Sequence, residues 1–228
     1  MSSPFRYLLA LVLLPPAAAA SGVTSAQLAE TLSRAAPAAN PKVLALATQA
    51  LTCVQRSMPA QTLSVIDYSM PSTTQRLWVF ELGSKPRLLF HEWVAHGRNS
   101  GDNLANRFSN QPGSLMSSLG TFVTDGTYTG HNGYSLRLKG IDGHFNDQAE
   151  SRAIVIHGAS YVSEAFARSQ GRLGRSWGCP AVRTGVAHKL IDAIADHSVV
   201  FAYYPDPGWL QGSRLLGGCG GNEVSSSR

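Results

Sequence analysis

The sequence predicts a mainly β domain of the α+β class, with a helical N-terminal segment and a C-terminal helix. Three observations favour it. The chain has 228 residues, 43% of them apolar, which is enough for one ordinary core. Its 22 Gly and 12 Pro are typical of a turn-rich, β-rich body. From residue 62 the helix-like apolar spacing gives way to short β-branched and aromatic runs.

Residues 1–20 read as a secretory signal peptide. Arg6 precedes the apolar run Leu8–Leu14, and small residues follow up to Ala20, where we expect cleavage. The run is too short to span a membrane as a mature helix, and no other long apolar stretch follows. The sequence therefore predicts an exported protein of the periplasm or cell envelope, without stable membrane insertion.

Residues 21–58 are expected to be helical. Apolar residues keep a helix-like spacing, Pro37 interrupts it, and Pro41 is well placed to open a second helix. Residues 59–210 are expected to form the main domain and 211–228 a flexible Gly- and Ser-rich tail. The expected strands are 62–68, 76–82, 87–96, 119–125, 134–139, 153–157 and 198–204, with a long loop at 97–118 and a helix at 185–196.

The charge pattern argues against a nucleic-acid partner. The formal charge is +5 and the sequence pI is about 9.3, but Lys and Arg are scattered, without a basic run or basic helix. The chain has three cysteines. In an exported protein this odd number leaves one cysteine over, which is either a free thiol or the disulfide partner of a cysteine in another chain.

Cys179 and His157 are the candidate nucleophile and base. The strand 153–156 ends at His157-Gly158, and Cys179 lies in Ser176-Trp177-Gly178-Cys179-Pro180. A thiol needs a base to become a strong nucleophile near neutral pH, and imidazole has a suitable pKa. Pro180 suits a first helical position, which would place Cys179 at a helix N-terminus. The plain alternative is a buried core thiol and a hydrogen-bonded strand-end histidine.

The stretches 152–159 and 174–182, together with 133–138 and 145–147, resemble the murein L,D-transpeptidase catalytic domain in its divergent YkuD-like branch. The resemblance covers about residues 60–205. It implies a β-sandwich or barrel catalytic domain that needs no cofactor. It also implies acyl transfer from a tetrapeptide stem of peptidoglycan to an amine of a second stem, with release of D-Ala, and acylation of the cysteine by carbapenems.

Carried over by position, the resemblance makes Cys179 the nucleophile and His157 the base. The carbonyl of Gly158 would orient the imidazole. The backbone amides of Gly178 and Cys179 would form the oxyanion hole, and Ser176 would support the loop by hydrogen bonds.

The sequence departs from the commoner branch at Trp177, where that branch has His, and at Ala181, where it often has a polar residue. These changes affect how the acceptor is held. Arg175 and Arg183 are therefore candidates for binding stem carboxylates, with Trp177 as a further substrate contact, although both arginines also fit a solvated surface. Two alternatives stay open: an L,D-carboxypeptidase or amide hydrolase with the same Cys-His pair, and a non-catalytic wall-binding module.

The other histidines and cysteines give weaker indications of function. His91 and His96 are five apart in an expected strand, which does not suit a zinc site, so no metal is predicted. His131 and His144 read as exposed loop residues. With Cys179 assigned as nucleophile, a disulfide between Cys53 and Cys219 would account for the other two cysteines and would stabilise the fold.

Overall fold

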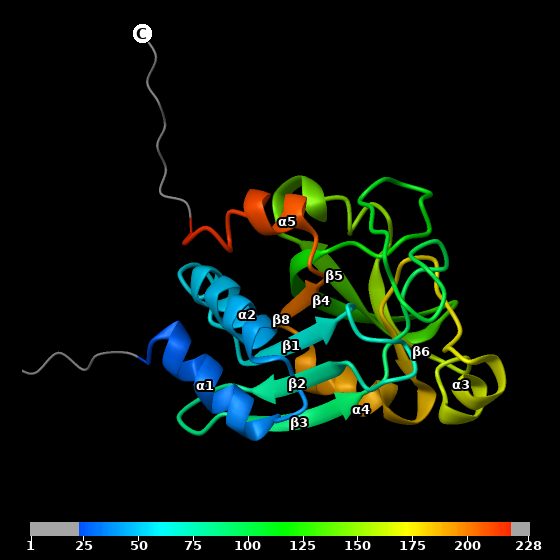
Figure 1. Ribbon diagram of the computed structural model, residues 1–228, viewed down its shortest axis with the longest axis horizontal. Coiled ribbons are helices and arrows are strands. Elements are labelled where there is room, and N and C mark those ends of the chain that lie inside the picture. Colours follow the sequence, from blue (N-terminus) through cyan, green and yellow to red (C-terminus); the bar gives the residue numbers. More distant parts are fainter. Residues whose placement is uncertain (1–22, 220–228) are drawn as a thin grey trace, which may run out of the picture.

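The computed structural model describes residues 23–219, so the predicted signal peptide lies outside the described residues. A mixed sheet dominates this part of the chain, which confirms the mainly β, α+β prediction (Figure 1). Its strands are β1 Thr62–Asp67, β2 Leu77–Glu81, β3 Arg87–Glu92, β4 Gly120–Gly130, β5 Gly133–Gly140, β6 Val155–Ala159, β7 Ala181–Arg183 and β8 Val199–Tyr203. The helices are α1 Ser25–Ala35, α2 Pro41–Val54, η1 Gly143–Phe145, α3 Glu164–Gln170, α4 Thr184–Ile194 and α5 Pro207–Gly212.

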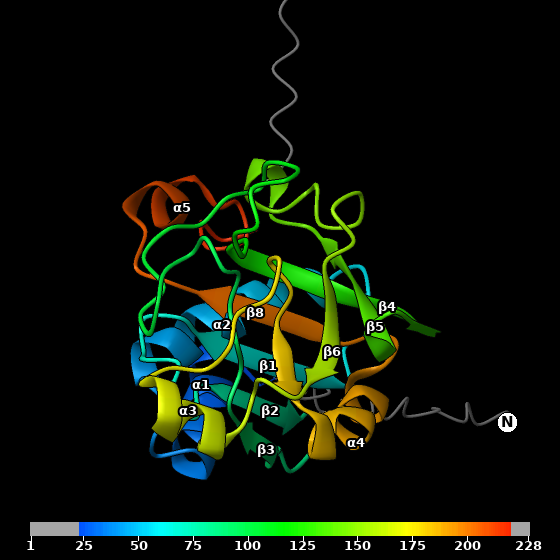
Figure 2. The ribbon, with the colours of Figure 1, turned by 90° about the vertical axis from the view of Figure 1, so that its right-hand side faces the viewer.

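The sheet curls until its two edges almost meet. Its strand order is β3-β2-β1-β8-β4-β5-β6-β7, and β1–β8 and β6–β7 are the parallel pairs. Just beyond β3, the amide of Ala95 donates to the carbonyl of Ala181 in β7 over 2.8 Å. Arg183 of β7 also makes two hydrogen bonds, of 2.8 and 2.5 Å, to the carboxylate of Glu92 at the end of β3. The result is a nearly closed, barrel-like sandwich, as Figure 2 shows.

The contact between Arg183 and Glu92 gives a test of this closure. The Glu92 side chain is 8% exposed, so removing its guanidinium partner leaves a nearly buried carboxylate unpaired. Arg183→Ala is expected to lower the free energy of unfolding by about 1–3 kcal/mol in urea titrations. Arg168→Ala, which breaks the exposed pair with Glu164, is the matched control and should cost at most about 0.5 kcal/mol. Equal losses in the two variants would contradict the closing role of Arg183.

The N-terminal helices form as the sequence predicts. Thr24 caps α1 with a capping box, and Asn40 caps α2, whose first residue is Pro41. The two helices lie side by side, with α2 against β1 and β8 and α1 against β3 (Figure 1). Leu44 and Leu51 of α2 are fully buried in the same core as the strands. The N-terminal helical segment thus shares one hydrophobic core with the sheet.

The prediction of a helix directly after Pro180 is wrong. Residues 181–183 form β7, because this short segment pairs on one side with β6 and on the other with Ala95, and Ala181 and Val182 are fully buried. The helix predicted for 185–196 is present as α4, which begins at Thr184. The run 87–96 is likewise a strand only as far as Glu92, while β4 continues five residues beyond its predicted end.

The C-terminal segment is attached to the body as far as Cys219. Ser213 donates from Oγ to the carboxylate of Asp142 over 2.6 Å, and Gln49 of α2 donates to the carbonyl of Leu216. Residues 220–228 of the predicted tail lie outside the described residues. Within residues 23–219, no helix combines the length and the apolar character needed to cross a membrane.

Candidate active site

The pairing of β6 with β7 brings Cys179 close to the strand that carries His157. His157 lies opposite Ala181, so continuing this register places Cys179 beside Val155, two residues before His157. The Sγ of Cys179 accepts a hydrogen bond from the Val155 amide over 3.4 Å and lies 3.6 Å from the carbonyl oxygen of Ala153. The backbone at the start of β6 therefore fixes the position of the sulfur.

The His157 imidazole is oriented by its neighbour. Its Nδ1 lies 3.0 Å from the carbonyl oxygen of Gly158. Because a carbonyl can only accept, Nδ1 carries the proton and Nε2 is left with a free lone pair. Burial lowers the pKa of His157 below 6.5. A neutral imidazole with an available Nε2 is the form that can accept a proton at neutral pH.

Gly158 has a second role in placing this histidine. A Cβ added at Gly158 would lie 2.9 Å from the Cβ of Ala187 in α4, closer than two such atoms normally approach. The absence of a side chain therefore lets α4 pack directly against β6. The helix α4 and the strand that carries His157 are held together at this contact.

The Cys179 thiol is nearly buried, with 8% of the residue exposed. Burial raises the pKa of Cys179, and the opposing effects of the Val155 amide and the Arg152 guanidinium are smaller. No helix begins at Pro180, so no helix dipole stabilises a thiolate here. The resting residue is therefore a neutral thiol, and making the nucleophile requires transfer of its proton to a base.

Ser176 and Gly178 shape the turn before Cys179. The Oγ of Ser176 donates to the carbonyl of Cys179 over 2.6 Å and accepts from the amide of Gly178 over 3.1 Å. Gly178 has a φ of +125°, and a Cβ there would lie 2.8 Å from the carbonyl oxygen of Met116. Only glycine suits this position. The Gly178 amide already donates to Ser176, so of the two amides predicted to form the oxyanion hole the Cys179 amide is the remaining candidate.

Arg152 fixes the long loop over this turn, a role that the sequence reading missed. Its guanidinium donates to the carbonyls of Ser109 and Met116 and to the hydroxyls of Ser114 and Ser118. The loop 97–118 is thus held by a side chain three residues before β6. The signal was a charged residue shortly before a buried strand, beside the motif, but sequence spacing does not show what such a side chain contacts.

Ser117 links the same loop to the turn that carries Cys179. Its Oγ donates to the carbonyl of Gly178 over 3.0 Å, and it accepts from the amide of Gly97 over 3.0 Å. Its own amide donates to the hydroxyl of Ser100 over 2.9 Å. These buried bonds join both ends of the loop to the turn.

The candidate substrate contacts differ in their surroundings. Arg175 donates to the carbonyls of Arg98 and Gly101 and pairs with Asp102 at 2.8 Å. Arg183 is bound to Glu92, as described above. Trp177 is 74% exposed and presents a large apolar surface two residues before Cys179. Both arginines already have carboxylate partners, whereas the Trp177 ring is accessible.

The other candidate histidines are either packed against other side chains or exposed, and the backbone carbonyl of His96 accepts from the amide of Ser176 over 3.0 Å. His96 is buried against Arg76, with Nδ1 2.7 Å from the guanidinium, and burial together with this cation lowers the pKa of His96 to about 4. His91 stacks on Trp78, and His131 is exposed. His144 is also exposed and packs on the ring of Phe145. Within residues 23–219 there is no group of three or more His, Cys, Asp or Glu side chains placed to hold a metal.

Comparison with known families decides the relationship. The family model for the YkuD_2 type of L,D-transpeptidase catalytic domain matches residues 35–203, well over half of the chain. The chain belongs to the L,D-transpeptidase catalytic domain family. Members of this family act on the cell wall, which fits a disulfide-containing protein of an oxidising compartment.

The solved structures that are similar to this chain, several of them described as L,D-transpeptidases, are only distantly similar. The Mycobacterium smegmatis enzyme is 14% identical with a TM-score of 0.41, over 64% of this chain and 59% of its own. Bdellovibrio bacteriovorus Bd1075 is 14% identical with a TM-score of 0.41, over 65% and 49%. The Stackebrandtia nassauensis enzyme is 15% identical with a TM-score of 0.35, over 81% and 92%. The matches thus span about half to three fifths of the first two relatives. No curated protein matches the chain.

Proposed function

We propose that this protein is an exported peptidoglycan L,D-transpeptidase with Cys179 as nucleophile and His157 as base. The observation that carries the proposal is the arrangement on β6. The strand's first amide holds the sulfur of Cys179, and two residues later His157 has its Nδ1 fixed by the Gly158 carbonyl. Family membership supplies the substrate class, the tetrapeptide stems of peptidoglycan.

In the first half-reaction, Nε2 of His157 takes the thiol proton as the sulfur attacks the carbonyl carbon of the third stem residue. The carbonyl oxygen becomes an oxyanion, for which the Cys179 amide is a donor. Collapse of the tetrahedral intermediate breaks the bond to D-Ala, and the proton on His157 passes to the departing amine. A thioester on Cys179 remains.

In the second half-reaction, an amine of another stem attacks the thioester carbon. His157 accepts the amine proton, and the new amide forms as the sulfur leaves. The proton then returns from His157 to the thiolate of Cys179. The nearly buried thiol limits the access of water to the thioester, which favours an amine held in place over hydrolysis.

Mass spectrometry of purified disaccharide-tetrapeptide incubated with the protein tests the proposal. A dimer that has lost D-Ala should form with the wild type and be absent with Cys179→Ala. A tripeptide without dimer would instead establish a hydrolase with the same residues. No product, together with no acylation of Cys179 by a carbapenem, would overturn the enzyme and favour a wall-binding module.

A further inference from the structure

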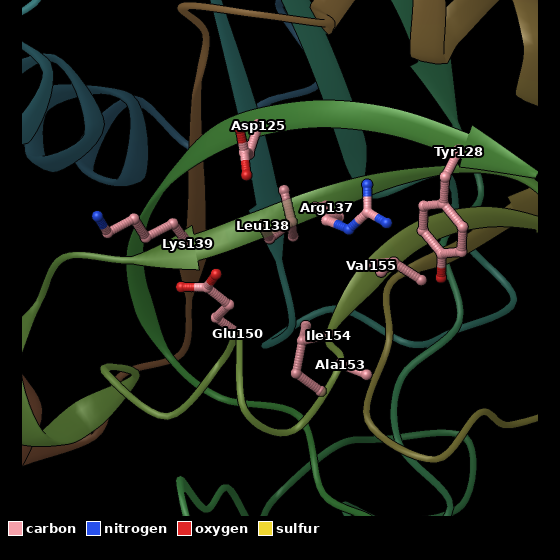
Figure 3. Close-up of a pocket in the computed structure, with 9 residues that line it drawn as sticks. All are labelled: Asp125, Tyr128, Arg137, Leu138, Lys139, Glu150, Ala153, Ile154 and Val155. Carbon is pink, nitrogen blue, oxygen red and sulfur yellow. The ribbon is translucent and has the colours of Figure 1, made fainter.

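A pocket of about 270 Å³ lies over β4, β5 and the start of β6, and Figure 3 shows the residues that line it. One wall is the segment 153–155, which also holds the sulfur of Cys179 through the Ala153 carbonyl and the Val155 amide. A ligand in this pocket would therefore touch Ala153 and Val155, the two residues whose backbone contacts the sulfur of Cys179.

Arg137 reaches the pocket from the same sheet face as His157. In the β5–β6 pairing, Arg137 lies opposite Val155 and Ser135 lies opposite His157. Residues opposite one another in an antiparallel pair share a face, so the side chains of Arg137 and His157 project to the same side. Diagonal neighbours of this kind lie about 7–8 Å apart. A single substrate residue can span that separation.

The chain also presents Arg137 in a fixed orientation. Its guanidinium lies 4.1 Å from the centre of the Tyr128 ring, a cation–π contact that restricts the long side chain. The register of β4 shifts between Thr124 and Thr127, so a bulge lies opposite Arg137, and its first residue, Asp125, also lines the pocket. Figure 3 shows Arg137 between Asp125 and Tyr128.

Four charged side chains line the pocket without a partner of opposite charge in the described part of the chain. Arg137 and Lys139 supply two cations, and Asp125 and Glu150 supply two carboxylates. Over residues 23–219, none of these four side chains forms an ion pair. Arg175 and Arg183, by contrast, already bind carboxylates. Of these three arginines, Arg137 is the one whose guanidinium remains available to a ligand carboxylate.

We propose that this pocket binds the end of a stem-peptide side chain that carries both a carboxylate and an amine, as a diaminodicarboxylate at the third stem position does. The planar guanidinium of Arg137 binds the carboxylate in a two-pronged contact, and Glu150 faces the ammonium group. The proposal rests on the proposed transpeptidase function and makes Arg137 the residue that selects the donor stem.

Steady-state kinetics with two donor tetrapeptides test this selection. One donor has the diaminodicarboxylate at position three, and the other has lysine, which lacks the side-chain carboxylate. Arg137→Gln is expected to raise KM for the first donor by about 10- to 100-fold, the range for a lost charged hydrogen bond, with kcat changed much less. KM for the lysine donor should stay unchanged. Arg56→Gln, at an exposed arginine after α2, is the matched control.

A third donor, with the side-chain carboxylate amidated, separates the possible sources of the carboxylate. The KM of the wild type for this amidated donor should equal the KM of Arg137→Gln for the first donor. An equal KM increase for all donors would overturn the proposal and indicate that Arg137 binds the D-Ala carboxylate or supports the fold.

Binding calorimetry separates this proposal from the proposed reaction. In the Cys179→Ala background, the first donor should bind about 10- to 100-fold more weakly when Arg137→Gln is added. If the wild type forms no product while Arg137→Gln weakens the binding of this donor alone, the pocket is retained and the transpeptidase is rejected. Equal affinity in the two variants would reject the pocket, whatever the activity.

Discussion

Replacing His157 with glutamine is expected to lower kcat/KM for the tetrapeptide donor by about 10²- to 10⁴-fold, the usual contribution of a general base. The Cys179 thiol is neutral at rest because burial raises its pKa, so the reaction depends on a base to take its proton. Glutamine keeps a side-chain donor for the Gly158 carbonyl but cannot accept a proton. Product formation followed by mass spectrometry measures the loss.

The same variant should change the pH profile. Burial lowers the pKa of His157, so the wild-type imidazole becomes protonated, and the base is lost, only as the pH falls below 6.5. The acid limb of the kcat/KM profile should have its midpoint below that value and should be missing from the residual activity of His157→Gln. His131→Gln, at an exposed loop histidine, is the control and should keep the wild-type profile. An unchanged acid limb in His157→Gln would reject His157 as the base.

The sequence was sufficient for elements whose pattern is local. The helical spacing with Pro41 located α2, and the buried residues Leu190, Ile191 and Ile194 located α4. Most of the strands could be placed from β-branched runs between turns. The residues around Cys179 and His157 carried the family resemblance, because they form two short, contiguous motifs.

Features that depend on distant pairing were missed or misplaced. The segment 181–183 is too short to show a period, and it is a strand only because β6 and Ala95 lie on either side of it. Nothing in the local sequence shows that Glu92 lies next to Arg183, so the ion pair between them was not predicted. The pocket around Arg137 combines a bulge with a cross-strand register, and neither can be read from a single strand.

The disulfide between Cys53 and Cys219 confirms the predicted pairing and carries the second large effect. The two cysteines are 166 residues apart, so the bond joins α2 to the C-terminal segment and encloses nearly the whole domain. Replacing both with serine is expected to lower the free energy of unfolding by about 2–5 kcal/mol, because the unfolded chain regains the freedom that the cross-link removes. Urea titration with and without a reductant measures this loss.

Reduction supplies the control for that experiment. A reductant should destabilise the wild type by about the same amount as the double substitution and should leave the double variant unchanged. Equal stability of the wild type with and without the reductant would contradict a stabilising role for the bond.

The bond also has a chemical consequence, since the sequence contains three cysteines and two of them are paired. Cys179 is then the one thiol open to acylation, so a thiol titration of the unfolded, unreduced protein should count one group per chain.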